Sequence, residues 1–348
     1  MTRRRTRLAW ILALVCAAAF VRVVIGTPAA IVLAAVAPAL GYTGLLLLLD
    51  RYEREPIGLV LAMLLWGGAV AAPLASALND LLLSWPAARG VVPILGAPVV
   101  EEAAKSLGLL VLLGLVPDEI DDTLDGLVYG AVVGVGFAMT ENLTYFTLAA
   151  VQGGTDGLVQ SLYLRGGLAG FNHAAFTAAI GAGIGFCREA RSPRAGRIGL
   201  ATGVAVALGQ HAVWNGIAAP ALTRALCGAE LPGGPCAASP PPWALYVVAP
   251  LVVGLFLGPG GLVLLGVALL ALGREARLIA HELRPEVDAG TLTREEYARL
   301  SSVRARLLGE WGALLRGGWR AWRRVRGRHR DVTELAFSRA RLRNPARG

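Results

Sequence analysis

The feature that most constrains this chain is a succession of apolar runs, each long enough to cross a lipid bilayer as a helix. A transmembrane helix needs about 20 predominantly apolar residues, and its backbone satisfies its own hydrogen bonds in lipid. Runs of this kind occupy residues 8–24, 29–49, 57–77, 92–115, 124–150, 161–186, 198–219 and 243–272. The expected fold class is therefore all-α, a polytopic membrane bundle of about eight transmembrane helices.

The amino-acid composition agrees with a membrane protein. Of the 348 residues, 55% are hydrophobic and only 16% are charged, whereas a soluble globule carries roughly 25% charged residues. The mean hydropathy of the chain is +0.58. These values exclude an ordinary soluble domain, a fibrous chain and a disordered chain.

The formal net charge of +9 is concentrated at the C-terminal end. Residues 273–348 hold 18 arginines and 9 acidic residues, while the preceding residues hold equal numbers of basic and acidic side chains. The chain therefore divides into a transmembrane helical domain, 1–272, and a cytosolic basic tail, 273–348. We expect the tail to form amphipathic helices that are broken near Pro285 and Gly290.

Arginine is also placed asymmetrically around the apolar runs. It is abundant before the first run, in the loops after the second and sixth runs and in the tail, whereas the outer loops carry only Arg89 and Arg224. Positive side chains stay on the cytosolic side of a membrane. The pattern predicts a multi-pass protein of the cell membrane with both termini in the cytosol.

Cys227 and Cys236 would then share an outer loop, where a disulfide is chemically possible.

The tail also contains a segment, 316–324, in which tryptophans lie among arginines. Aromatic and basic side chains beside a membrane are typical of interfacial binding to anionic lipid. The same composition can bind nucleic acid. Because the membrane is adjacent, we favour anionic lipid and expect no nucleic-acid partner.

Several ionisable side chains lie inside the apolar runs. A charge at the bilayer centre costs at least about 2.5–3.5 kcal/mol, so these residues need partners or a wet cavity. With a rise of 1.5 Å per residue, four runs place a carboxylate or an imidazole about 12–18 Å from their outer ends. The residues of this layer are Glu101, Glu102, Lys105, Glu141, His173 and His211, accompanied by Asn142, Tyr145 and Asn215.

The spacing of these residues is compatible with one shared site. Lys105 follows Glu101 by four residues and Glu102 by three, so its ammonium group can reach either carboxylate. Glycines that repeat every four residues in 126–134 and 181–185 allow two helices to approach closely. A buried Glu–Lys pair or a single histidine can serve packing alone, but a whole layer of such groups indicates a function.

The chemistry that this layer best supports is hydrolysis of a carbonyl compound. The sequence has no G-x-S-x-G nucleophile motif and no H-E-x-x-H zinc helix. Water is then the nucleophile and a glutamate the general base. The histidines and Asn215 could donate hydrogen bonds to the oxyanion. We expect a peptidase that needs neither a metal nor another cofactor.

Three alternatives remain open at this stage. Carboxylates and histidines within the membrane could relay protons in an ion- or proton-coupled transporter. The same fold could also be a non-catalytic membrane scaffold. A third alternative is a zinc hydrolase whose ligands are His173, His211 and a glutamate.

Five motifs in sequence order resemble the PrsW family of glutamic-type intramembrane proteases, which is distantly related to the CAAX prenyl proteases. They are E-E-x-x-K at 101–105, D-G-L-V-Y-G at 125–130, F-x-x-x-E-N-x-x-Y at 137–145, F-N-H at 171–173 and H-x-x-x-N at 211–215. The acidic, proline-terminated segment 50–56 is also similar to a family element. The resemblance covers roughly residues 50–215.

The resemblance implies an intramembrane endopeptidase with a defined set of site residues. By this resemblance Glu101 activates the water and Glu102 assists or orients it. Glu141, His173, His211 and Asn215 would complete the catalytic site, supported by Lys105, Asn142 and Tyr145. The implied substrate is a membrane-anchored protein, such as an anti-sigma factor, that is cut on its outer side.

Overall fold

The computed structural model describes residues 3–49, 52, 55–227 and 240–343, and within these ranges every regular element is a helix. The expected all-α fold class is confirmed. The chain forms two compact units. The first contains Met1–Leu46 and Pro56–Leu265, and the second contains Leu47–Glu55 and Gly266–Gly348.

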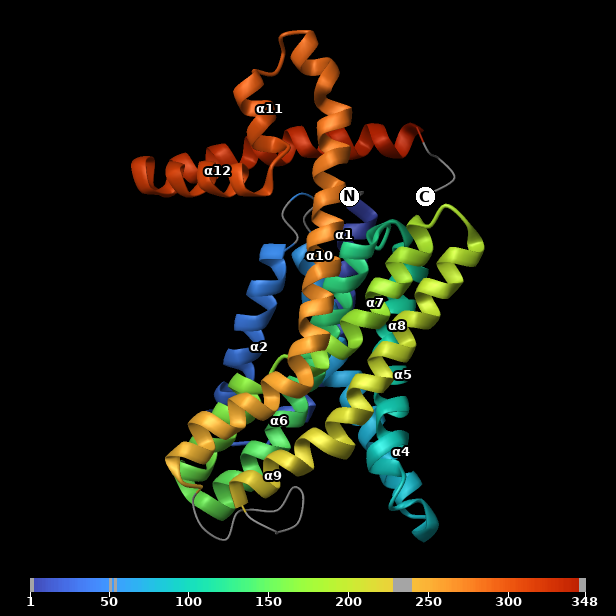
Figure 1. The fold of residues 1–348 in the computed structure, drawn as a ribbon, viewed down its shortest axis with the longest axis vertical. Helices are drawn as coiled ribbons and strands as arrows, with labels where there is room; N and C mark the ends of the chain where they lie inside the picture. The colour runs from blue at the N-terminus through green and yellow to red at the C-terminus, as the bar shows by residue number, and fades with distance from the viewer. Residues whose placement is uncertain (1–2, 50–51, 53–54, 228–239, 344–348) are drawn as a thin grey trace. The chain divides into compact units, whose positions relative to one another are not determined.

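The elements follow one another along the chain as Figure 1 labels them. The α-helices are α1 (Arg3–Val24), α2 (Ala29–Leu49), α3 (Ile57–Trp66), α4 (Ala72–Leu83), α5 (Ala97–Leu115), α6 (Thr123–Ser161), α7 (Asn172–Glu189), α8 (Pro193–Val213), α9 (Ala219–Cys227), α10 (Ala249–Asp288), α11 (Arg294–Leu300) and α12 (Val303–Arg343). Short π- or 3₁₀-helical segments are η1 (Gly67–Ala71), η2 (Pro86–Ala88), η3 (Val92–Gly96), η4 (Pro117–Glu119), η5 (Leu162–Leu168), η6 (Trp214–Ala218) and η7 (Ala244–Val248).

The eight apolar runs expected to cross the membrane are helical, except that residues 169–171 of the sixth run form a turn between η5 and α7. Five helical stretches of the described residues are long and apolar enough to span a bilayer, namely Arg7–Val24, Ala29–Leu49, Ile57–Leu83, Thr123–Glu189 and Ala244–Asp288. The fourth stretch holds two of the expected runs. The runs 92–115 and 198–219 coincide with α5 and α8, which are not among the five. The number eight therefore stays a prediction.

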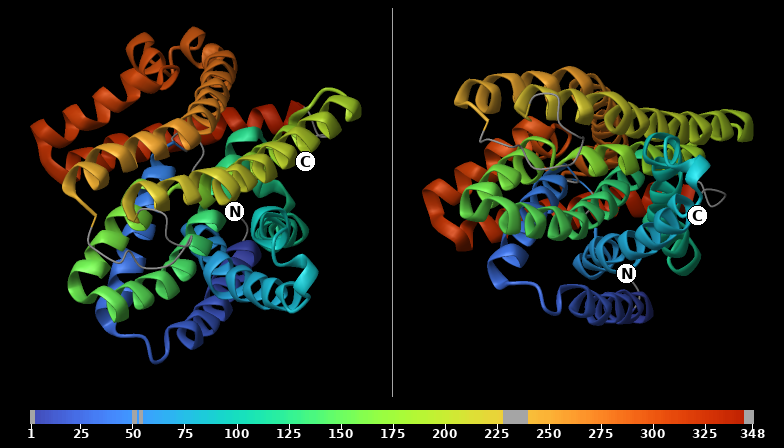
Figure 2. Two further views of the ribbon diagram at one scale, coloured as in Figure 1. Left: turned by 60° about the horizontal axis from the view of Figure 1, so that its bottom comes forward. Right: turned by 90° about the horizontal axis from the view of Figure 1, so that it is seen from below.

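The first unit is built around α6, which packs along α7, while α7 in turn packs along α8 (Figures 1 and 2). The glycine repeats lie at the α6–α7 contact. A Cβ added to Gly134 would lie 2.1 Å from the carbonyl oxygen of His173, and one added to Gly181 would lie 1.9 Å from that of Gly126. Both distances are far inside van der Waals contact, so the two backbones touch directly. This contact sets the position of His173 relative to α6.

The start of α6 is fixed by a reciprocal capping arrangement. The Asp122 side chain accepts hydrogen bonds from the backbone N–H groups of Leu124, at 2.7 Å, and Asp125, at 3.1 Å. The Asp125 carboxylate accepts one in return from the N–H of Asp122, at 3.3 Å. Thr123 then donates to Glu189 at the end of α7, at 2.6 Å. These bonds fix the first turn of α6 against the last turn of α7.

The second unit contains the C-terminal part of α10, together with α11 and α12. The expected break near Pro285 is wrong, because α10 continues to Asp288. Proline removes a single backbone donor, and Pro285 lies in the last turn of the helix. The chain turns instead at Gly290, whose φ of +73° favours glycine.

Polar side chains form a buried core in this second unit. Glu310 lies 3.4 Å from Arg306 and 3.1 Å from His329, and all three are buried. The Arg306 guanidinium lies over the ring of Tyr52, 5.1 Å from its centroid.

Tyr52 belongs to the acidic, proline-terminated segment 50–56. Of the other residues of this segment, the structure describes only Glu55 and Pro56. The proposed Cys227–Cys236 disulfide lies outside the described residues.

Candidate functional site

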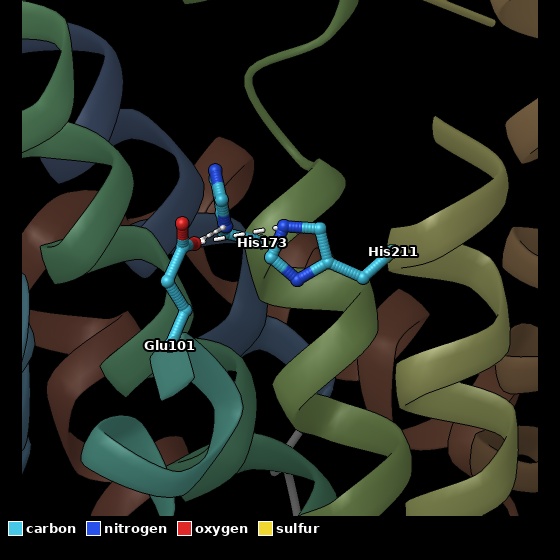
Figure 3. A group of neighbouring side chains, drawn as sticks. All are labelled: Glu101, His173 and His211. Atoms are coloured by element: carbon cyan, nitrogen blue, oxygen red, sulfur yellow. Dashed lines mark ion pairs between the residues drawn. The ribbon is translucent and has the colours of Figure 1, made fainter. Parts of the chain in front are cut away.

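Three side chains from three helices converge in the first unit. Glu101 lies on α5, His173 begins α7 and His211 lies near the end of α8. The Glu101 Oε2 atom is 3.5 Å from Nε2 of His211 and 3.9 Å from Nδ1 of His173. Figure 3 shows the carboxylate facing both imidazole rings. Residues that are far apart in sequence thus meet at one point, as the shared depth of the sequence layer predicts.

Glu102 is the fully buried carboxylate of the site. Its Oε1 atom accepts hydrogen bonds from Lys105 Nζ at 2.6 Å and from His211 Nδ1 at 3.0 Å. Its Oε2 atom accepts one from Thr177 Oγ1 at 2.9 Å. Both Glu102 and Lys105 are almost completely buried. Since its oxygens are occupied by three donors, Glu102 is suited to orient His211 and not to receive a proton from water.

Glu141 holds the other histidine from the opposite side. Its Oε2 atom lies 2.9 Å from His173 Nε2 and accepts a hydrogen bond from Arg165 Nη2 at 2.8 Å. The Nε atom of Arg165 also donates to Asn142 at 3.0 Å. The guanidinium lies over the Tyr145 ring, 3.5 Å from its centroid. Asn142 and Tyr145 therefore contact the site through Arg165.

Arg165 and Thr177 are site residues that the sequence analysis does not single out. Arg165 had a usable signal, because it is one of the few basic residues within an expected span. Thr177 had no such signal, since its hydroxyl is one of many small polar groups in the apolar runs.

Two phenylalanine rings pack against the charged and imidazole side chains of the site. Lys105 Nζ lies 4.1 Å from the ring centroid of Phe137, and Phe176 stacks on His211 with centroids 4.7 Å apart.

The hydrogen-bond partners determine which ring nitrogen carries the proton. An ammonium group only donates, so the contact of 3.0 Å between Lys105 Nζ and His173 Nδ1 makes Nδ1 the acceptor and leaves the proton on Nε2, facing Glu141. A carboxylate accepts, so His211 carries its proton on Nδ1, facing Glu102. The lone pair of His211 Nε2 then points toward Glu101.

Glu101 Oε2 is buried and accepts no hydrogen bond from any residue that the structure describes, and it forms a longer ion pair with Lys105 Nζ, at 3.8 Å. It faces a second acceptor, the His211 lone pair, across 3.5 Å. Two acceptors at this distance are stable only if a proton donor or a cation lies between them. The geometry thus calls for a protonated group, a water molecule or a metal ion at this point.

The three side chains fit a divalent metal by donor type and spacing. Two imidazoles and a carboxylate suit zinc, whose bonds of about 2.0–2.2 Å place tetrahedral ligand atoms roughly 3.3 Å apart. The ligand atoms of Glu101, His173 and His211 all lie within 4.8 Å of one another. Each histidine also offers its other nitrogen to a carboxylate, Glu102 or Glu141, as metal-binding histidines do. Binding would require Lys105 to release His173 Nδ1.

Asn215 is the one catalytic candidate that the structure places apart from this cluster. Its Nδ2 atom donates to the carbonyl oxygen of Pro93 at 2.9 Å. The reason is local, because α8 passes into the π-helical segment η6 at Trp214. Asn215 lies in η6, and its amide is held by the backbone of η3. Its proposed role as an oxyanion donor has no support from this contact.

Comparison with known proteins places this site in a family. Residues 55–255 match the family described as "PrsW family intramembrane metalloprotease". Protease PrsW of Geobacillus kaustophilus (strain HTA426) is 33% identical over 123 residues, 34% of this chain and 53% of that protein. Protease PrsW of Bacillus subtilis (strain 168) is 30% identical over 119 residues, 33% of this chain and 53% of that protein.

The matched region contains every residue of the cluster. The chain spans about half the length of the curated relatives it matches, and no solved structure matches it. Because the family match covers more than half of the chain and includes all three converging helices, this membrane protein belongs to the PrsW family.

Proposed function

We propose that this protein hydrolyses a peptide bond of a membrane-anchored protein at the centre formed by Glu101, His173 and His211. The observation that carries the proposal is the buried Glu101 Oε2, which accepts no hydrogen bond from the described residues and faces imidazole nitrogens from two other helices. Leaving a buried carboxylate without hydrogen bonds costs free energy. A site that retains it is suited to bind and polarise a water molecule.

We further propose that these three side chains hold a divalent metal ion. When bound, the metal supplies an activated water and a Lewis acid for the scissile carbonyl. Glu102 and Glu141 fix the orientations of His211 and His173 through the nitrogens that face away from Glu101. Lys105 compensates the charge of Glu102 at 2.6 Å. The description of the family as intramembrane metalloproteases supports this assignment.

Metal removal is the direct test. The purified protein is reconstituted in liposomes with a single-span reporter whose outer segment is unstructured, and reporter cleavage and bound metal are both measured. We expect 1,10-phenanthroline to abolish cleavage and zinc to restore it, because in this proposal the ion supplies the activated water and the Lewis acid. The non-chelating isomer 1,7-phenanthroline is the control. Full cleavage by protein shown to contain no metal would contradict the metal assignment.

A second mechanism is favoured by one specific contact. Lys105 Nζ already occupies His173 Nδ1 at 3.0 Å, which leaves only Glu101 Oε2 and His211 Nε2 open. In this metal-independent mechanism Glu101 takes the proton directly from the attacking water, as the sequence analysis expects. Protein without metal would then cleave the reporter at the full rate, and phenanthroline would have no effect.

The substrate and the orientation are also proposals. The resemblance supports a membrane-anchored substrate such as an anti-sigma factor, and the arginine distribution supports a cell-membrane location with both termini cytosolic. Comparing the membrane proteome of a deletion strain carrying the wild-type protein with one carrying Glu101→Gln would identify fragments that depend on activity. Fragments of soluble proteins alone would contradict a membrane-anchored substrate.

We propose that α12 binds anionic lipid. Its exposed apolar residues lie among many arginines and include Leu308, Trp311, Leu315 and Trp319, the last 59% exposed. In nanodiscs, lipids that carry a fluorescence quencher should quench Trp319 only when phosphatidylglycerol is present, and added salt should weaken the effect. The difference between the wild type and Trp319→Phe shows which part of the fluorescence comes from Trp319. Equal quenching in pure phosphatidylcholine would contradict binding through charge.

A further inference from the structure

The segment η5, between α6 and α7, brings Arg165 to the site. Arg165 is not an isolated surface charge, because its guanidinium makes three different contacts. It donates to Glu141 at 2.8 Å and to Asn142 at 3.0 Å, and it lies over the ring of Tyr145. Glu141 uses the same oxygen for Arg165 and for His173. The position of Arg165 therefore affects the position of His173 through a single atom.

The segment η5 is itself held by Tyr42 of α2. The Tyr42 hydroxyl donates to the carbonyl oxygen of Gly167 at 2.7 Å and lies 3.1 Å from that of Gly166. The ring packs against Phe171, with centroids 5.7 Å apart. A Cβ on Gly170 would lie 2.8 Å from the Tyr42 ring, so glycine makes room for it. Helix α2 thus fixes the turn from which Arg165 extends.

Exposure shows which end of the cluster is accessible. The side chains of Arg165 and Glu141 are 29% and 27% exposed, compared with 11% for Glu101 and 2% for His211. Arg165 thus lies at the open rim of the site, and Glu101 and His211 lie behind it. A residue in this place could either bind the arriving substrate or hold the histidine, and the two roles predict different kinetics.

We propose that Tyr42 and Arg165 are positioning residues for His173. Tyr42 holds η5, Arg165 holds Glu141, and Glu141 holds Nε2 of His173, whose Nδ1 lies 3.0 Å from Lys105 Nζ and 3.9 Å from Glu101 Oε2. The planar guanidinium donates hydrogen bonds to Asn142 and Glu141 from two different nitrogens at once. A lysine ammonium group on a flexible stem does not reproduce this geometry. This inference rests on the proposed function only for its kinetic readout.

The kinetic test separates positioning from substrate binding. We expect Arg165→Ala to lower kcat for reporter cleavage by about 10–100-fold, as loss of an outer-shell histidine partner does, with Arg165→Lys intermediate. KM should change by less than about twofold, because the lost contact is not made with the substrate. Added guanidinium ion should restore part of the rate. A rise in KM at unchanged kcat would overturn positioning in favour of substrate binding, and Arg224→Gln, an exposed arginine on α9, is the control.

Coupling between the two residues tests the relation between them. If Tyr42 acts through η5 and Arg165, Tyr42→Phe should lower kcat in the wild-type background and have little further effect in Arg165→Ala. Additive losses would overturn the connection.

Hydrogen exchange provides a readout that needs no activity. Tyr42→Phe should speed exchange of the amides in 162–171, while Tyr246→Phe, which alters a tyrosine that packs edge-on against Tyr163 of the same segment, should leave it unchanged. If the wild-type protein cleaves nothing, the proposed function fails, and this measurement still tests the contact. Unchanged exchange in Tyr42→Phe would overturn it.

Discussion

Glutamine in place of Glu101 should abolish cleavage, while the metal-free variant should fold as well as the metal-free wild type or better. The substitution preserves the shape of the side chain but removes the charge that either holds a metal or takes a proton. We expect the rate to fall by roughly 10³-fold or more, as for other residues that touch the reacting atoms. An amide N–H can also donate to the His211 lone pair, which removes the mutual repulsion of two acceptors 3.5 Å apart. Measured on metal-free protein, the melting temperature of Glu101→Gln should therefore equal that of the wild type or exceed it.

Reporter cleavage and thermal unfolding in detergent are measured on the same preparation of Glu101→Gln. Glu295→Gln, which removes an exposed carboxylate of the second unit, is the matched control. His211→Ala should lose activity to a similar extent. Retained cleavage in Glu101→Gln would refute the proposed centre. Proton-linked uptake by the wild type that disappears in the variant, with no cleavage in either, would support the transporter alternative instead.

Alanine in place of Gly134 should inactivate the protein through the backbone of its neighbour. The added Cβ would lie 2.1 Å from the carbonyl oxygen of His173, and backbone cannot rotate away as a side chain can. Helix α7 must move, and His173 moves with it. Overpacking of this kind typically costs about 1–3 kcal/mol. A displacement of about 1 Å at a reacting group can lower a rate by roughly 100-fold.

The measurements for Gly134→Ala are again cleavage and melting temperature, and we expect both to fall. Gly209→Ala on α8 is the matched control, because a Cβ at that position meets no atom of another described residue within 4 Å. Alanine has the higher helix propensity, so the control should be as stable as the wild type or more stable. A fully active Gly134→Ala protein would show that α6 and α7 are not in the close contact described above.

The sequence predicts much of this architecture for reasons that are local. Twenty apolar residues in lipid have no alternative to a helix, and a rise of 1.5 Å per residue places buried charges at a common depth. The i,i+3 spacing also anticipates the Glu102–Lys105 pair, found at 2.6 Å. Glycine repeats predict close packing, which the α6–α7 contact shows.

The tertiary structure decides what depends on how each helix is rotated about its axis. Rotation follows from the neighbours against which a helix packs and from π-helical turns, and the sequence of one run does not say which helix will be its neighbour. It is the structure that turns Asn215 toward Pro93 and brings Arg165 onto Glu141. It also leaves Glu101 Oε2 facing His211 with no hydrogen-bond donor among the described residues. Depth along a helix is a property of one segment, whereas the direction of a side chain depends on all its neighbours.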